Sequence, residues 1–137
     1  MTIRVLVADD QAMIRGALAG LLDLESDIEV VAQAADGARA LEELARLASA
    51  DAPARASTPV DVAIIDVEMP RMDGITATQA IHSRFPGVRV LIVSTFGRPG
   101  YLQRALDAGA TGFMVKDAPV EALADGVRTV AAGGRAI

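Results

Sequence analysis

Asp66 is the residue of this chain that is best placed to do chemistry, because it directly follows the apolar run from Val62 to Ile65. Apolar residues on both faces of that run predict a strand buried on both sides, as in a parallel sheet. Ligands of open α/β sheets bind at the carboxyl ends of the strands, so a carboxylate there can meet a substrate while its strand holds it in place. Met69-Pro70 predicts an extended exit from the strand. Asp73-Gly74 predicts a turn into a helix, with Asp73 as its N-cap.

Three other predicted strands also end in polar residues. Asp9-Asp10 follow the strand 3–8, Ser94-Thr95 follow the strand 88–93, and Lys116 follows the strand 112–115. The carboxyl ends of parallel strands share one edge of the sheet, so we expect these side chains to lie together. Clustered carboxylates repel unless a cation is present, and their oxygens suit Mg²⁺. A carboxylate nucleophile, a metal, an ammonium and a hydroxyl around one point form a site for phosphoryl transfer.

Each of these residues also has a simpler interpretation. Asp10 could cap the first helix, Ser94 could be an ordinary hydroxyl at a strand end, and Lys116 could be a solvated lysine. All of them stand at strand ends, however, and in the order that such a site requires. The joint pattern therefore favours the phosphoryl-transfer site over a set of separate coincidences.

Strand and helix patterns alternate five times along the chain, which predicts an α/β fold with a parallel sheet and helices on both of its faces. The predicted strands are 3–8, 28–32, 62–65, 88–93 and 112–115, and the predicted helices are 11–24, 38–47, 74–84, 101–108 and one from Pro119 to Gly133-Gly134. The Ala-, Pro- and Ser-rich stretch 49–59 is longer than most αβ loops, and we interpret it as a solvated spacer.

Composition excludes several classes of protein. The 137 residues are 52% apolar with no cysteine, which indicates one folded domain over 1–137 without disulfides or thiolate chemistry. The net charge of −5 argues against nucleic-acid binding by this piece. No signal-peptide pattern or membrane-spanning apolar run is present, so we expect a cytoplasmic protein that does not enter a membrane. The single histidine, His82, has no partner at a suitable spacing, and we expect it at the surface.

The combination of Asp9-Asp10, Asp66, Met69-Pro70, Asp73-Gly74, Ser94 and Lys116 resembles the receiver domain of two-component response regulators. The resemblance extends over essentially the whole chain. It implies a flavodoxin-like (βα)5 doubly wound parallel sheet with strand order 2-1-3-4-5. It also implies one receiver domain over 1–137, with an effector DNA-binding domain absent from this chain.

The resemblance also implies a role for each residue of the site. Asp66 would accept a phosphoryl group from a sensor histidine kinase, with Lys116 and Ser94 contacting the phosphoryl oxygens. Mg²⁺ would be bound by Asp10, Asp66 and the backbone carbonyl of Glu68, and by Asp9 mainly through water. Phe113 matches the aromatic position of the conformational switch, which it would form together with Ser94. The domain would phosphorylate and dephosphorylate itself without being an enzyme that turns over other substrates.

Finer features resemble the NarL/FixJ branch, whose members carry a LuxR-type helix-turn-helix and control transcription. These features are Lys116-Asp117 and the ending Ala-Ala-Gly-Gly-Arg, and the loop from Thr95 to Tyr101 is similar to that of the desaturase-regulator (DesR-like) group. The parent protein would therefore bind DNA. We also predict a homodimer favoured by phosphorylation, formed through the first and fifth helices with Met13, Ala17, Leu21 and Val127 or their neighbours.

Two other functions remain open at this stage. An aspartyl-nucleophile phosphatase would share the aspartate, the Mg²⁺ and the lysine, but such enzymes usually have Asp-x-Asp where this chain has Asp66-Val67-Glu68, and they lack the Asp9-Asp10 pair. A phosphate-independent interaction module with the receiver fold would need no complete site. Turnover separates the first alternative from a receiver, and the absence of phosphorylation would indicate the second.

Overall fold

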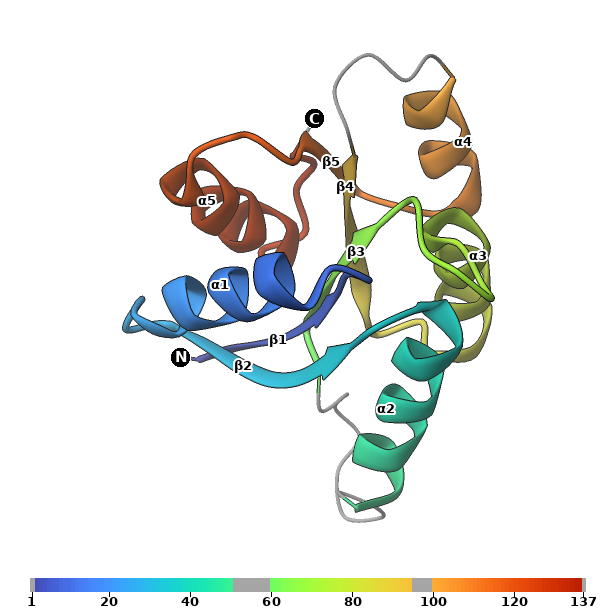
Figure 1. The fold of residues 1–137 in the computed structure, drawn as a ribbon, viewed down its shortest axis with the longest axis horizontal. Coiled ribbons are helices and arrows are strands. Elements are labelled where there is room, and N and C mark those ends of the chain that lie inside the picture. The colour runs from blue at the N-terminus through green and yellow to red at the C-terminus, as the bar shows by residue number, and fades with distance from the viewer. Residues whose placement is uncertain (1, 51–59, 95–99, 137) are drawn as a thin grey trace.

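The computed structural model describes residues 2–50, 60–94 and 100–136, and in these ranges strands and helices alternate as predicted (Figure 1). The predicted spacer 49–59 and the predicted loop from Thr95 fall largely outside these ranges. The elements are β1 (Ile3–Ala8), α1 (Ala12–Asp23), β2 (Ile28–Ala34), α2 (Gly37–Ala50), β3 (Val62–Asp66), α3 (Gly74–Arg84), β4 (Arg89–Ser94), α4 (Tyr101–Ala108), β5 (Gly112–Val115) and α5 (Val120–Ala131).

The five strands form one parallel sheet in the order β2-β1-β3-β4-β5, which confirms the predicted doubly wound, flavodoxin-like topology. The predicted boundaries of β1, α3, α4 and β5 coincide with the observed ones, and those of the other elements differ by one to three residues. β2 continues to Ala34, and α2 begins at Gly37 and continues to Ala50. Ala48 and Ala50 are good helix formers, so the helix continues beyond Leu47, the last strongly apolar position of its predicted pattern.

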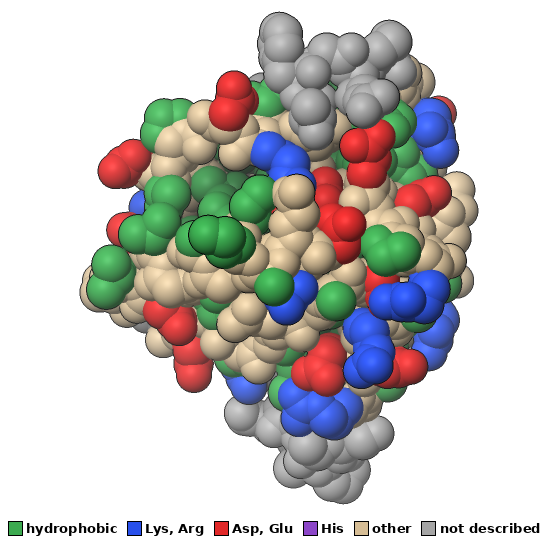
Figure 2. All heavy atoms as spheres, viewed as in Figure 1, with side chains coloured by type: hydrophobic (Ala, Val, Ile, Leu, Met, Phe, Trp, Pro, Cys, Tyr) green, Lys and Arg blue, Asp and Glu red, His purple; other side chains and the backbone are tan. Residues whose placement is uncertain are grey.

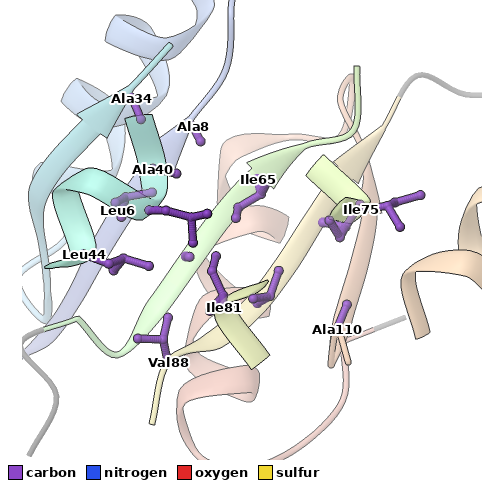
Figure 3. Close-up of a cluster of buried hydrophobic side chains, with 14 of the residues drawn as sticks. Leu6, Ala8, Ala34, Ala40, Leu44, Ile65, Ile75, Ile81, Val88 and Ala110 are labelled. Carbon is purple, nitrogen blue, oxygen red and sulfur yellow. The ribbon is translucent and has the colours of Figure 1, made fainter. Parts of the chain in front are cut away.

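Helices cover both faces of the sheet, with α1 and α5 on one face and α2, α3 and α4 on the other (Figure 1). Each face has its own core, because successive strand residues point to opposite sides. On β3, Ala63 and Ile65 join the core under α2 and α3, and Val62 and Ile64 join the core under α1 and α5. Figure 3 shows Ile65 close to Ile75 and Ile81 of α3 in the first of these cores.

The register of the sheet aligns the strand ends that carry the candidate site. Ala8 pairs with Ile65, so Asp9 and Asp66, the next residue on each strand, lie side by side. Ser94 pairs with Val115, which places Lys116 beside the end of β4. A shift of one residue in any of these pairings would turn the side chains to opposite faces, so the buried strand faces fix the geometry of the site.

The chain after α5 returns to the sheet. It turns at Gly133-Gly134, and Ala136 then forms an isolated parallel bridge with Gly112 at the outer edge of β5. The Phe113 amide donates a 2.7 Å hydrogen bond to the Ala136 carbonyl, and the Ala136 amide donates one of 3.1 Å to the Thr111 carbonyl. Within the described ranges, no helix has the length and apolar character that crossing a lipid bilayer requires.

Gly74 joins β3 to α3 at a point with no room for a side chain. Its amide donates a 2.8 Å hydrogen bond to the Val67 carbonyl, and a Cβ added to it would lie 2.1 Å from the Asp66 carbonyl oxygen. The next helix can therefore begin directly beneath the candidate site. Asp73 is the N-cap of that helix, as predicted, and accepts a 2.8 Å hydrogen bond from the Thr76 amide.

We predict that Gly74→Ala lowers the free energy of unfolding by about 2 kcal/mol or more, because the added methyl group must displace the backbone of β3. Gly16→Ala is the matched control, since nothing lies within 4 Å of a Cβ at this helical position. It should raise stability by about 0.5–1 kcal/mol through helix propensity. Urea denaturation measures both, and a Gly74→Ala variant as stable as wild type would contradict the close approach.

Candidate functional site

The predicted site residues meet at the carboxyl edge of the sheet. Asp9, Asp66 and Ser94 are buried, Lys116 is largely buried, and Asp10 is exposed. Asp10 does not cap α1, because Gln11 occupies the N-cap position without a side-chain hydrogen bond. The Asp9 carboxylate instead accepts a 2.8 Å hydrogen bond from the Gln11 amide, which fixes its orientation.

Three carboxylates of this edge form a compact oxygen cluster. One oxygen from each of Asp9, Asp10 and Asp66 lies within 4.8 Å of those of the other two. An open pocket of about 220 Å³ beside them is lined by Asp10, Gln11, Asp66, Glu68 and Lys116. Oxygen ligands in this number, next to space for water, are what a hard divalent cation such as Mg²⁺ requires.

Lys116 supplies the positive charge of the cluster. Its Nζ lies 3.2 Å from Asp9 Oδ2 and 3.2 Å from Asp66 Oδ2, and the contact with Asp66 has hydrogen-bond geometry. Asp9 Oδ2 is buried without a hydrogen bond. This oxygen pairs with the Lys116 ammonium but accepts no hydrogen bond, so it has lone pairs left for a further cation in the cluster.

The charges of the site shift the pKa values of its groups. Burial and the neighbouring charge of Asp9 raise the pKa of Asp66 from its ordinary 3.8 to about 6, although Lys116 opposes this shift. Burial alone would lower the pKa of Lys116, but Asp66 and Asp9 raise it above its ordinary value. The ammonium therefore stays charged at neutral pH, and without a metal the cluster holds more negative charge than Lys116 can balance.

The chain from Val67 to Asp73 forms a loop that borders the site. Its ends are joined by the hydrogen bond from the Gly74 amide to the Val67 carbonyl, and Val67 donates to the Val93 carbonyl of β4 at 3.1 Å. The side chain of Glu68 is exposed and accepts a 3.1 Å hydrogen bond from the Tyr101 hydroxyl of α4. The backbone of the loop thus follows the edge of the carboxylate cluster.

The family model of the response regulator receiver domain matches residues 5–128 of the chain. The chain belongs to the response regulator receiver family. This match covers all four strand ends that carry the site, and it confirms the family that the sequence predicts. The receiver fold therefore accounts for both the sheet topology and the position of the acidic cluster.

Among the curated proteins, the receiver is 39% identical to the uncharacterized transcriptional regulatory protein YvfU and 38% identical to the transcriptional regulatory protein DesR, both of Bacillus subtilis. Both matches cover 97% of this chain, but only 61% and 60% of the two relatives. Among solved structures, the signal receiver domain of the putative response regulator NarL from Mycobacterium tuberculosis is 34% identical with a TM-score of 0.83, over 96% of this chain and 98% of that one. These similarities confirm the predicted NarL/LuxR branch.

Two predicted positions need comment. Phe113 is half-buried against the core under α2, α3 and α4, where a rotation of its ring would change the packing on that face. Val127 is completely buried in the core under α1 and α5. The prediction that Val127 lines a dimer interface is therefore wrong, because the apolar stripe of α5 faces the sheet. His82 is exposed, as predicted, and lies against Gly109.

Sequence reasoning missed three residues close to the site. Tyr101 contacts Glu68, and Arg71 forms an ion pair with Asp36 across two loops. Asp36-Gly37 was recognisable as a turn at the carboxyl end of the second strand, on the same edge as the site. Its partner was not recognisable, because contacts between loops follow neither the helical nor the strand period.

We predict that Asp66→Asn stabilises the metal-free protein, and more so at pH 7.5 than at pH 4.5. Asp66 binds its proton more tightly in the folded state, so its contribution to stability is present below pH 3.8 and is lost as pH rises through about 6. Asparagine does not titrate. The difference in free energy of unfolding between variant and wild type should grow by on the order of 1 kcal/mol across this range, after allowance for solvent screening. Urea denaturation in EDTA at both pH values measures it, and an equal difference at both would contradict the shifted pKa.

Proposed function

We propose that this receiver accepts a phosphoryl group on Asp66 from a phosphohistidine of a sensor histidine kinase. The observation that carries the proposal is the Asp66 carboxylate at the floor of an open pocket, 3.2 Å from Lys116 and beside Asp9 and Asp10. In the transfer, an Asp66 oxygen forms the new bond to phosphorus while the bond from phosphorus to the histidine nitrogen breaks. The Lys116 ammonium stabilises the charge on the phosphoryl oxygens during that step.

Asp10, Asp66 and the backbone carbonyl of Glu68 would hold Mg²⁺, and Asp9 would contribute mainly through water. The bound ion would supply charge neutralisation for the incoming phosphoryl group. Ser94, at the end of β4, would donate a hydrogen bond to a phosphoryl oxygen. Its inward movement would let Phe113 rotate, so that the face formed by β4, β5 and α4 has two packings whose balance phosphorylation shifts.

The phosphorylated domain would regulate an output and would not turn over a substrate, apart from its own autodephosphorylation. We propose that the output is transcription in the cytoplasm, because the relatives DesR and YvfU are transcriptional regulatory proteins. The chain spans about three-fifths of the length of those relatives. DNA binding would accordingly belong to a helix-turn-helix domain outside residues 1–137 and not to this acidic domain.

We expect intact mass spectrometry after incubation with acetyl phosphate and Mg²⁺ to detect one phosphate adduct on wild type and none on Asp66→Ala. Asp73→Ala is the matched control, because this neighbouring aspartate caps α3 and should leave the adduct in place. No adduct on a wild type that binds Mg²⁺ would favour the phosphate-independent module. Continuous release of inorganic phosphate from excess acetyl phosphate, at many turnovers per minute, would favour the phosphatase.

A homodimer favoured by phosphorylation fits the surface of α1. Met13 is 88% exposed, Leu24 79% and Leu21 43%, and Ala17 is also exposed. Figure 2 shows hydrophobic side chains over the region of α1 and α5, on the left of the view. The exposed residues of α5 include Glu121 and Asp125, so we place α1 at the centre of the interface and α5 at its border.

Sedimentation velocity of the phosphorylated protein should give a dimer for wild type and a monomer for Leu21→Arg, because a charge in an apolar interface is strongly unfavourable. Leu102→Arg is the matched control, since Leu102 is 40% exposed but lies on α4. It should dimerise like wild type. A wild-type monomer at high concentration, or equal behaviour of the two variants, would exclude α1 as the interface.

A further inference from the structure

Two loops at the carboxyl edge of the sheet meet through one ion pair, whose carboxylate is buried and whose guanidinium is largely exposed. Asp36, in the loop between β2 and α2, is completely buried. Its Oδ1 accepts a 2.8 Å hydrogen bond from the Arg39 amide, and its Oδ2 accepts from Arg71 Nε at 2.7 Å and pairs with Arg71 Nη2 at 2.6 Å. Arg71 belongs to the loop between β3 and α3, so this contact of two guanidinium nitrogens with one carboxylate oxygen joins the two loops.

The backbone of Arg71 has a strained conformation. It is the one non-glycine residue with positive φ, +65°, in the described part of the chain. The Met72 amide donates a 2.7 Å hydrogen bond to the Pro70 carbonyl, so the chain makes a γ-turn with Arg71 at its centre. Turns of this hand are rare and cost free energy, so the surrounding structure must hold the residue in place.

The backbones of the two loops are also in direct contact. The Gly37 amide donates a 3.0 Å hydrogen bond to the Met72 carbonyl, and a Cβ on Gly37 would lie 2.6 Å from that oxygen. The γ-turn at Arg71 is therefore held from one side by the Asp36 carboxylate and from the other by the Gly37 amide. Both contacts come from the same short segment after β2.

The buried carboxylate depends on Arg71 for its charge balance. Burial alone would raise the pKa of Asp36, but the Arg39 amide and the Arg71 guanidinium lower it below 3.8. Asp36 is thus ionised at neutral pH. Without the Arg71 guanidinium, the buried Asp36 carboxylate would keep one hydrogen-bond donor among the described residues, the backbone amide of Arg39. A buried charge with so few partners is costly, and this cost favours rearrangement of the loop.

We propose that Asp36 and Arg71 are positioning residues that fix the backbone of the loop from Val67 to Asp73, and with it the carbonyl of Glu68 that would hold Mg²⁺. The inference rests on the proposed function of the site. The hydrogen bond from the Gly74 amide to the Val67 carbonyl fixes the two ends of the loop. A change of the backbone angles at Arg71 must therefore change the backbone angles of other residues between Val67 and Gly74. Glu68 lies among those residues, and its carbonyl would move.

Calorimetric titration with MgCl₂ tests the proposal. Arg71→Ala and Asp36→Asn should each weaken Mg²⁺ binding by about 10-fold or more, as expected for residues that orient a metal ligand from outside the coordination shell. Asp36→Asn keeps the acceptor for the Arg39 amide and preserves folding. The double variant should bind no more weakly than the worse single variant, because the two residues act as one pair.

Arg128→Ala is the control for lost stability. Arg128 of α5 forms an ion pair of 2.8 Å with Asp27. Asp27 directly precedes β2, so this pair lies at the edge of the sheet opposite the carboxylate site. Its replacement should lower the unfolding temperature without changing the dissociation constant of Mg²⁺. Arg71→Gly is the second control, since glycine tolerates positive φ but has no guanidinium. It should bind Mg²⁺ as weakly as Arg71→Ala, and a wild-type affinity in Arg71→Gly would overturn the proposal.

Amide hydrogen exchange without metal provides an independent readout. In Arg71→Ala the hydrogen-bonded amides of Val67 and Met72 should exchange at least about 10-fold faster than in wild type, while those of α5 stay unchanged. Unchanged exchange together with unchanged Mg²⁺ affinity would overturn the role of the pair and leave the proposed function intact. A wild type that binds no Mg²⁺ would overturn both.

Discussion

The mutual repulsion of three carboxylates is the constraint on which this structure depends. Asp9, Asp10 and Asp66 are kept within 4.8 Å of one another because the register of β1 and β3 leaves them no other position. The folding free energy of the sheet and its two cores holds together charges that would separate in solution. Lys116 reduces the repulsion from the neighbouring end of β5 without removing it. Binding of a cation or protonation of a carboxylate is therefore favourable at this edge of the sheet.

Much of this arrangement follows from simple patterns. Period-2 and continuous apolar runs locate the strands, and the rule that parallel strands share a carboxyl edge brings Asp9, Asp66, Ser94 and Lys116 together before any coordinates are known. The resemblance to receivers adds the order of the strands. The N-cap role of Asp73 was also predictable, because capping depends on a residue type at a fixed position next to a helix.

The remainder could not be predicted for physical reasons. The contact between Asp36 and Arg71 joins residues 35 positions apart in two irregular loops, and no periodicity relates them. The error at Val127 has another origin: Leu123, Val127 and Val130 recur at helical spacing, and such an apolar stripe is typical of the face that packs against the sheet and not of a dimer surface. On α1 apolar residues occupy more than one face, so the pattern does not single out the buried one, and Met13 and Leu21 remain exposed.

The return of the chain to β5 has a consequence for the behaviour of the protein at high concentration. β5 is the last strand of the sheet, and the outer edge of such a strand offers free amides and carbonyls to any extended polypeptide. Here Ala136 occupies the Phe113 amide and the Thr111 carbonyl. A foreign strand would have to displace this segment before it could pair with the start of β5, so the chain after α5 protects that edge against strand-by-strand aggregation.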